Sequence, residues 1–166
     1  LQDQGIPAQK AATAISVFGI AVIAGRLIVG YLVDKLWAPG VAAVAISLPV
    51  IGSLMLVGAP GFFIACVAAA FLGFAAGAEL DLMAFLAAKY FGLLHYAKIY
   101  AVLYAALALA SGVAPMIFAT IFDITGSYNI GFLFGAGFFA IGALMILALG
   151  KYPDIATETD KGKTNP

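Results

Sequence analysis

The chain has 166 residues, of which 64% are hydrophobic and only 10% are charged, and its mean hydropathy is +1.11. An average soluble domain carries about a quarter charged residues, so this chain cannot cover a surface exposed to water. Its net charge is zero, which gives no indication of a nucleic-acid partner. Several uncharged runs reach the roughly 20 residues that a helix needs to cross a bilayer, which predicts an all-α, polytopic membrane protein.

Cysteine and histidine are too scarce to support a disulfide or a metal site. Cys66 is the single cysteine and is interpreted as a small buried hydrophobe, and His95 has no cysteine or second histidine beside it. No metal and no cofactor are therefore expected. The chain begins at Leu1, and no signal sequence precedes its first apolar run. We expect it to be part of a longer protein.

The charges and turn residues divide the chain into five expected transmembrane helices, at about residues 11–33, 38–58, 61–91, 97–122 and 129–150. Residues 1–10 are polar and are predicted to form a loop outside the membrane. The uncharged run 36–78 is too long for one span, and its Gly-Ala-Pro-Gly sequence at 58–61 predicts a turn between two. A polar turn is expected at 123–128, and the charged residues 151–166 predict a disordered tail.

Prolines and glycines inside the expected helices predict kinks and close contacts. Pro49 and Pro115 lie within spans and predict kinks, which neighbouring helices of a membrane bundle can tolerate. Gly73-x-x-x-Gly77 puts two small residues on one face, the spacing that permits close helix contact. The last span has a similar small-residue face, made of Gly131, Gly135 and Gly142.

The distribution of Lys and Arg predicts the orientation in the membrane. With five spans, seven cations share one side, and the opposite side has only Lys10; the seven are Arg26, Lys35, Lys89, Lys98, Lys151, Lys161 and Lys163. Since cytoplasmic loops carry the excess of cations, the side with seven is predicted to be cytoplasmic, the C-terminus included.

The segment 25–39, GRLIVGYLVDKLWAP, concentrates charge between two apolar spans. Arg26 lies in the last two turns of the first span, and Asp34 and Lys35 mark its exit from the membrane. Gly25 and Gly30 are expected to let neighbouring backbones approach closely just before the turn.

The pattern Gly30-x-x-x-Asp34-Lys35, preceded by Gly25-Arg26-Leu27, resembles the loop signature of the major facilitator superfamily of secondary transporters. It is most similar to the second copy, between the eighth and ninth of the family's twelve helices, because Leu36 to Pro39 replace the glycine and basic residues of the fuller copy. Residues 77–101, 111–115 and 123–128 resemble the monocarboxylate and oxalate–formate-type branches. The chain would then comprise helices eight to twelve and the tail.

This resemblance implies alternating-access transport of a small solute, bound between two six-helix halves near the bilayer midplane. It implies the lipid bilayer, the missing half with helices one to seven, and the solute as partners, with a plasma or inner membrane location. An organic acid is the substrate class of those branches. However, residues 11–25 and the fourth span lack the deep cation with which such carriers often meet an anion.

Glu79 and Asp81 are the acids placed within a span, where carboxylates are costly and tend to be functional. Residues two apart on a helix point about 200° apart, so the two acids are expected to face different neighbours. Both are expected in the cytoplasmic half of their span, at the same side of the membrane as Arg26 in the first span. We therefore predict a gating or coupling network with Arg26, Asp34 and Lys35 nearby, because this depth favours a gate or a structural pair over a substrate ligand at the midplane. A proton-carrying role stays open for the less well paired acid.

Other interpretations of the same residues belong to different functional classes. A non-transporting structural or partner-binding membrane subunit is also a helical bundle, but it needs no acids inside a span. An ion channel would need a charge ring or filter segment. An enzyme would need a convergent nucleophile, metal or acid–base set, and the sequence shows none, so catalysis is not expected. The phenylalanines of the last span are interpreted as lipid contacts; they include Phe132, Phe134, Phe138 and Phe139.

Overall fold

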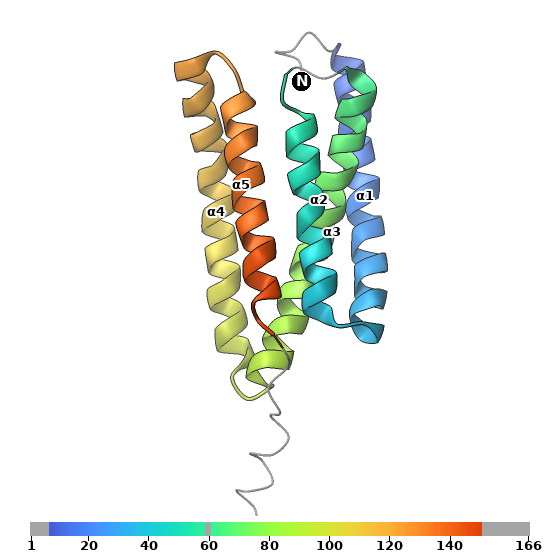
Figure 1. The fold of residues 1–166 in the computed structure, drawn as a ribbon, viewed down its shortest axis with the longest axis vertical. Helices are drawn as coiled ribbons and strands as arrows, with labels where there is room; N and C mark the ends of the chain where they lie inside the picture. The colour runs from blue at the N-terminus through green and yellow to red at the C-terminus, as the bar shows by residue number, and fades with distance from the viewer. Residues whose placement is uncertain (1–6, 59–60, 151–166) are drawn as a thin grey trace, which may run out of the picture.

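A computed structural model describes residues 7–58 and 61–150, and these residues form a bundle of five α-helices (Figure 1). The helices are α1 (Ala8–Lys35), α2 (Ala38–Met55), α3 (Phe62–Phe91), α4 (Tyr96–Thr125) and α5 (Asn129–Leu147). Each is long and apolar enough to cross a membrane. The prediction of an all-α, polytopic membrane protein is confirmed.

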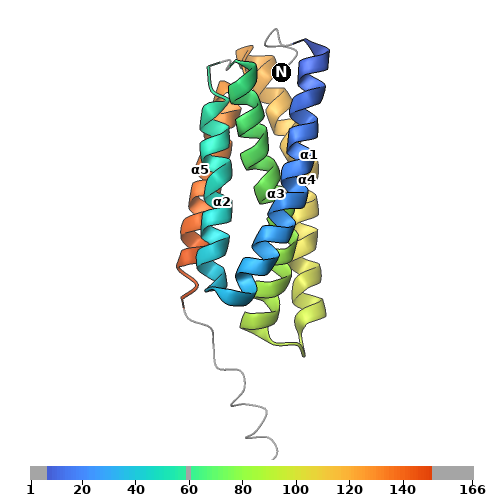
Figure 2. The same ribbon diagram turned by 90° about the vertical axis from the view of Figure 1, so that its right-hand side faces the viewer.

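The five helices run alternately up and down, so the bundle has two ends. The first, at the bottom of Figure 1, holds the α1–α2 and α3–α4 connections and the end of α5, and we call it the Asp34 end. The other, which we call the Asn129 end, holds the α2–α3 and α4–α5 connections. In the turned view α3 lies between α1 and α4 on one side and α2 and α5 on the other (Figure 2).

Several helix ends differ by one to three residues from those expected; α2 ends at Met55 and α5 at Leu147, for example, rather than at 58 and 150. Residues 8–10 are helical rather than part of a loop. Pro7 is the N-cap, and its carbonyl accepts the Ala11 amide at 3.0 Å, so the hydrogen-bond ladder of α1 begins there.

Asp123 lies in α4 rather than in a turn. That helix continues to Thr125 and ends where Gly126 adopts a left-handed conformation with φ of 66°. The predicted tail, 151–166, lies outside the described residues.

The buried core is small and consists mostly of alanine. It joins three helices and comprises Val29, Val33, Ala38, Ala42, Ala45, Ala78 and Leu82. Small side chains let helix backbones approach closely, which provides the packing attraction that holds helices together in lipid. α3 packs mainly along α1 and α2, and α2 along α5, whereas α4 has no buried residue.

Hydrogen bonds near both ends of α5 fasten it to the rest of the bundle. At the Asn129 end, the Gly58 amide donates to the Asn129 side-chain oxygen at 3.0 Å. At the Asp34 end, the Tyr90 hydroxyl donates to the Gly150 carbonyl at 2.8 Å. Nothing in the sequence pattern indicated either bond, because the partners are 71 and 60 residues apart.

Candidate functional site

The charges predicted to act together meet at one place, between α1 and α3. The Arg26 Nε donates to Asp81 Oδ2 at 3.1 Å, which forms an ion pair whose side chains are 56% and 36% exposed. The two residues are 55 positions apart in the chain. The pair therefore ties α1 to α3 at a position that lies inside both helices, away from their ends.

Glu79 does not join this pair. Among the described residues it makes no ion pair and no side-chain hydrogen bond. It lines a cavity of about 340 Å³ with residues of α2, α3, α4 and α5, and Asp81 is absent from that lining. The 200° offset of the two acids on α3 thus leads them to different neighbours, as the sequence predicted.

The Asp34 and Lys35 side chains also stand apart from the ion pair. The Lys35 ammonium donates to the Tyr31 hydroxyl and lies 4.4 Å from the centre of that ring. Asp34 is exposed, and in residues 7–58 and 61–150 its side chain has no ion pair or hydrogen bond. Of the five charged residues in the predicted network, the structure brings together only Arg26 and Asp81.

Glycines bring α1 and α3 into backbone contact beside the ion pair. A Cβ atom added at Gly25 would lie 2.1 Å from the Phe74 carbonyl oxygen, and one at Gly77 would lie 2.0 Å from the Val22 oxygen. At Gly73 the corresponding distance to the Phe18 oxygen is 2.4 Å. Real Cβ atoms do not approach so closely, so only glycine fits. The predicted close contact through Gly73 and Gly77 is confirmed.

The expectation for Gly30 is wrong. Within residues 7–58 and 61–150, nothing lies within 4 Å of a Cβ atom added at Gly30, so none of their backbones approaches it closely. Five residues separate it from Gly25, which turns it about 140° around the helix, and the two cannot contact the same neighbour. Pro49 and Pro115 lie inside α2 and α4, and their predicted kinks stay predictions.

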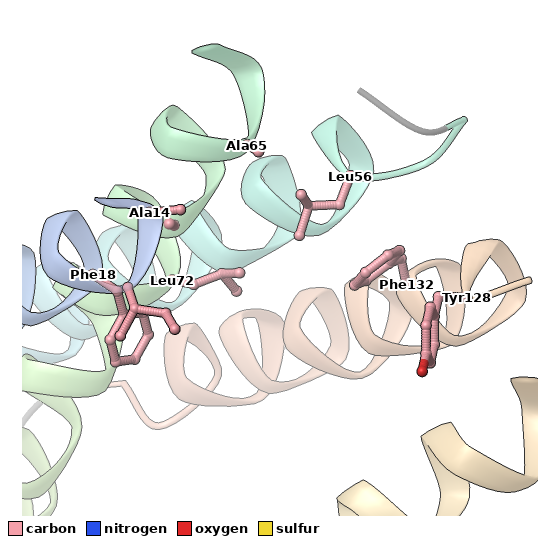
Figure 3. A pocket seen from close by; sticks show the side chains of 9 residues that line it. Ala14, Phe18, Leu56, Ala65, Leu72, Tyr128 and Phe132 are labelled. Atoms are coloured by element: carbon pink, nitrogen blue, oxygen red, sulfur yellow. The ribbon is translucent and has the colours of Figure 1, made fainter. Parts of the chain in front are cut away.

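The cavities of the bundle are almost entirely apolar. One, of about 250 Å³, lies toward the Asn129 end between Phe18 of α1, Leu72 of α3 and Phe132 of α5 (Figure 3). Another, of about 580 Å³, lies between α4 and α5, and Ser53 is its one hydroxyl-bearing lining residue. Neither presents a cation to an anionic solute.

Aromatic residues form a cluster that the sequence interpretation missed. Tyr128 stacks on Phe122 with centroids 4.5 Å apart, and Phe118 meets Phe132 edge-on at 5.9 Å. Phe132 is half-buried and packs on Phe118 within this cluster. The other phenylalanines named with it are exposed, at 62% for Phe134, 73% for Phe138 and 39% for Phe139.

Residues 1–165 match the sequence profile of the Major Facilitator Superfamily. The chain is a member of that superfamily. No curated protein and no solved structure matches the chain significantly. As a major facilitator, it is an integral, multi-pass membrane protein of a transporter family, and its five apolar helices contact the lipid bilayer.

In this major facilitator the Gly25–Lys35 segment serves two structural purposes. Its first part, Gly25 and Arg26, attaches α1 to α3 through backbone contact and the ion pair. Its last part, Asp34 and Lys35, is exposed at the end of α1. The first part of the segment is therefore packed against a neighbouring helix, and its last part is exposed at the end of α1.

Proposed function

We propose that the chain forms helices eight to twelve of a twelve-helix secondary transporter, which moves a small solute across a plasma or inner membrane by alternating access. The family match over residues 1–165 is the observation that carries the proposal. The helices α1 to α5 then correspond in order to the eighth to twelfth, and the partner is a half that contains helices one to seven.

The packing of α1 on α3 supports this proposal. Alternating access is largely a rigid-body rocking of one helix bundle against another. Backbone contact at Gly25, Gly73 and Gly77, together with the Arg26–Asp81 pair, makes α1 and α3 one body. In this proposal the ion pair keeps α1 and α3 together while the two halves move. Exposed charges such as Asp34 then open and close access to the solute path.

The substrate class proposed from the branch resemblance is an organic acid. Among the described residues, Arg26 is the cation that lies farthest from the helix ends. Its guanidinium already forms an ion pair with Asp81. An anion would therefore need a cation from the partner half. This makes the acid proposal testable by its dependence on both halves.

Uptake by the full-length protein in lipid vesicles tests transport directly. A panel of small carboxylic acids and neutral solutes is offered with and without a proton gradient, and saturable uptake of at least one solute is expected. This chain expressed alone should give no saturable uptake, since the path lies between halves. Absence of flux for every solute with the full-length protein would favour the non-transporting subunit.

Cysteine labelling tests the proposed orientation. In a Cys66→Ser background, a cysteine at Leu36 should react with an impermeant reagent only from the cytoplasm, and one at Gly126 only from outside. The two positions lie at opposite ends of the bundle. Labelling of both from one face would contradict the five-span arrangement.

A further inference from the structure

The cavity of about 580 Å³ between α4 and α5 is a groove with two helical walls and a floor. The two helices run side by side at one edge of the bundle (Figure 1). α4 contributes residues spaced three and four apart, from Ala110 to Ile121, which share one face of the helix. The opposite wall comes from α5, and the floor comes from Ser53 of α2 and Leu72 of α3. We call this cavity the α4–α5 groove.

The length of the α4–α5 groove matches one leaflet of a bilayer. Between Ala110 and Ile121 an α-helix rises about 16 Å, at 1.5 Å per residue. One leaflet contributes about 15 Å to the hydrocarbon core, which is half of the full thickness. Ile121 lies about one turn before Thr125, where α4 ends. The groove therefore extends from near the Asn129 end to about the middle of the membrane.

An aromatic ring closes the groove at the Asn129 end. A Cβ atom added at Gly131 would lie 2.9 Å from the Phe118 ring, and that ring meets Phe132 edge-on. One turn further along α5, a Cβ atom at Gly135 would lie 4.0 Å from the same ring, which is its one neighbour within 4 Å among the described residues. The Phe118 ring thus fills the space beside Gly131 and leaves the groove open from Gly135 inward.

The side of the groove is open along its length. Its rim residues are exposed, at 50% for Val113, 52% for Ile117 and 73% for Phe138. Because the end is closed and the side is open, an occupant enters laterally between the two helices. The surroundings of the membrane-spanning segments, rather than the water beyond the Asn129 end, therefore supply that occupant.

The chemistry and the size of the groove limit what fits. None of its lining residues is charged, and Ser53 supplies its one side-chain hydroxyl. A bound water needs two to four polar partners, so the groove does not favour water. A helix about 10 Å wide and 16 Å long occupies on the order of 1,300 Å³, more than twice the volume of about 580 Å³. A single hydrocarbon chain is thinner and has no polar group to satisfy.

We propose that the α4–α5 groove binds one acyl chain of a membrane lipid from the leaflet at the Asn129 end. The gain comes from close packing, because an unfilled groove lacks the van der Waals contacts that a chain supplies. The bound chain joins α5 to α4, a helix that buries no residue of its own. Since no charged residue lines the groove, recognition depends on the chain and not on the headgroup. The proposal does not depend on whether the protein transports a solute.

Photo-crosslinking of the full-length protein in lipid nanodiscs tests the proposal. The probe is a phospholipid with a diazirine in one acyl chain, and mass spectrometry locates the adducts. Rim residues meet lipid in any case, so the readout is the floor, Ser53 and Leu72, which a chain reaches only inside the groove. Ser53 is 4% exposed. Adducts on these two residues are expected, and their absence would overturn the proposal, as when a helix of the partner half covers the groove.

Two glycine substitutions on α5 separate the groove from the rest of the lipid-facing surface. Gly135→Leu places a side chain in the groove and should lower the floor adducts by about threefold to tenfold, the range for packing contacts in lipid. Gly137→Leu is the matched control, because Gly137 is outside the groove lining and a Cβ there meets none of the described residues within 4 Å. Ala114→Leu fills the groove from α4 and should act like Gly135→Leu. Equal floor adducts in Gly135→Leu and Gly137→Leu would contradict the proposal.

The headgroup provides a further test. Zwitterionic and anionic probes with the same chains should label the floor within about twofold of each other, since the groove presents no charge. Labelling by one headgroup class alone would mean that a charged contact selects the lipid, and the chain proposal would then be wrong. Size-exclusion chromatography of each variant shows whether a loss of adducts reflects misfolding, and Ala114→Leu then replaces Gly135→Leu if only the latter misfolds.

Discussion

The α1–α3 pair and the α4–α5 pair join helices in opposite ways. α1 and α3 meet backbone to backbone at three glycines, and an ion pair links them. α4 and α5 meet mainly through aromatic side chains at the Asn129 end, with an apolar cavity of about 580 Å³ beside them. α1 and α3 are therefore tightly packed, whereas α4 packs loosely and leaves most of its surface exposed.

Membrane physics explains why this difference matters. Lipid tails are as apolar as leucine, so helices in a bilayer gain little from hiding apolar surface from each other. Close packing and hydrogen bonds must hold them instead. α1 and α3 have both, whereas α4 has neither a buried residue nor a glycine contact of its own. We therefore expect stability to depend on α1 and α3 far more than on α4.

The largest effect is expected for Gly25→Ala. Its added Cβ would lie 2.1 Å from the Phe74 oxygen, so α1 and α3 must separate. Overpacking of this kind costs up to about 3 kcal/mol of unfolding free energy. Unfolding in mixed micelles, followed by the fluorescence of the single tryptophan Trp37, measures it. Gly19→Ala in the same helix is the control, because a Cβ there meets nothing within 4 Å; equal losses for both would refute the close-contact account.

A smaller effect is expected from the ion pair. Partly exposed pairs contribute up to about 1 kcal/mol, so a double-mutant cycle of Arg26→Gln and Asp81→Asn should give a coupling free energy of about that size. The same cycle with Asp34→Asn in place of Asp81→Asn should give none, since Asp34 does not contact Arg26. Strictly additive losses for Arg26 and Asp81 would show that the pair does not stabilise the fold.

Asn129→Ala tests the attachment of α5. The substitution removes the acceptor of the Gly58 amide, and a lost hydrogen bond lowers unfolding free energy by about 1 kcal/mol. Asn129→Asp keeps an acceptor oxygen and should recover most of the loss. If alanine and aspartate behave alike in the mixed-micelle assay, the bond is not what fastens the Asn129 end.

The smallest effect is expected for Gly30→Ala, within about 0.5 kcal/mol of the unaltered protein. There is open space for the methyl group. Comparing the stability of Gly30→Ala with that of Gly25→Ala shows which of the two glycines packs against a neighbouring helix. A stability loss as large as that of Gly25→Ala would mean that Gly30 also packs against a helix. Lost uptake with unchanged stability would assign Gly30 a contact with the partner half.

Much of the fold follows from local chemistry. Long apolar runs predict the five helices, because only a helix satisfies its backbone hydrogen bonds within one segment in lipid. Gly126 and Pro7 show where this reading is imprecise. Each shifts a helix end by a few residues, and the sequence does not reveal whether a polar residue next to a turn, such as Asp123, continues the helix.

For the candidate site, too, the sequence predicts some features, and the packing of the helices determines the others. From sequence alone, Glu79 and Asp81 had to face different directions, because helical geometry depends on spacing only. Which acid meets Arg26 depends on how α1 packs against α3, and that is a long-range contact across 55 residues. The spacing Gly73-x-x-x-Gly77 predicted a close contact, yet Gly25 and Gly30 looked equivalent until a neighbour lay against one and not the other.

Composition and periodicity by themselves determined that this chain is a five-helix membrane bundle, because transfer into lipid and helix formation depend on each segment's own residues. The tertiary structure alone decided that Asp81 is paired and Glu79 is not, that α5 is fastened by Asn129 and Tyr90, and that α4 buries nothing. Those outcomes depend on which helices are neighbours and at what rotation. A sequence read locally does not contain that information, because rotation is set by the closest backbone contacts in the whole bundle.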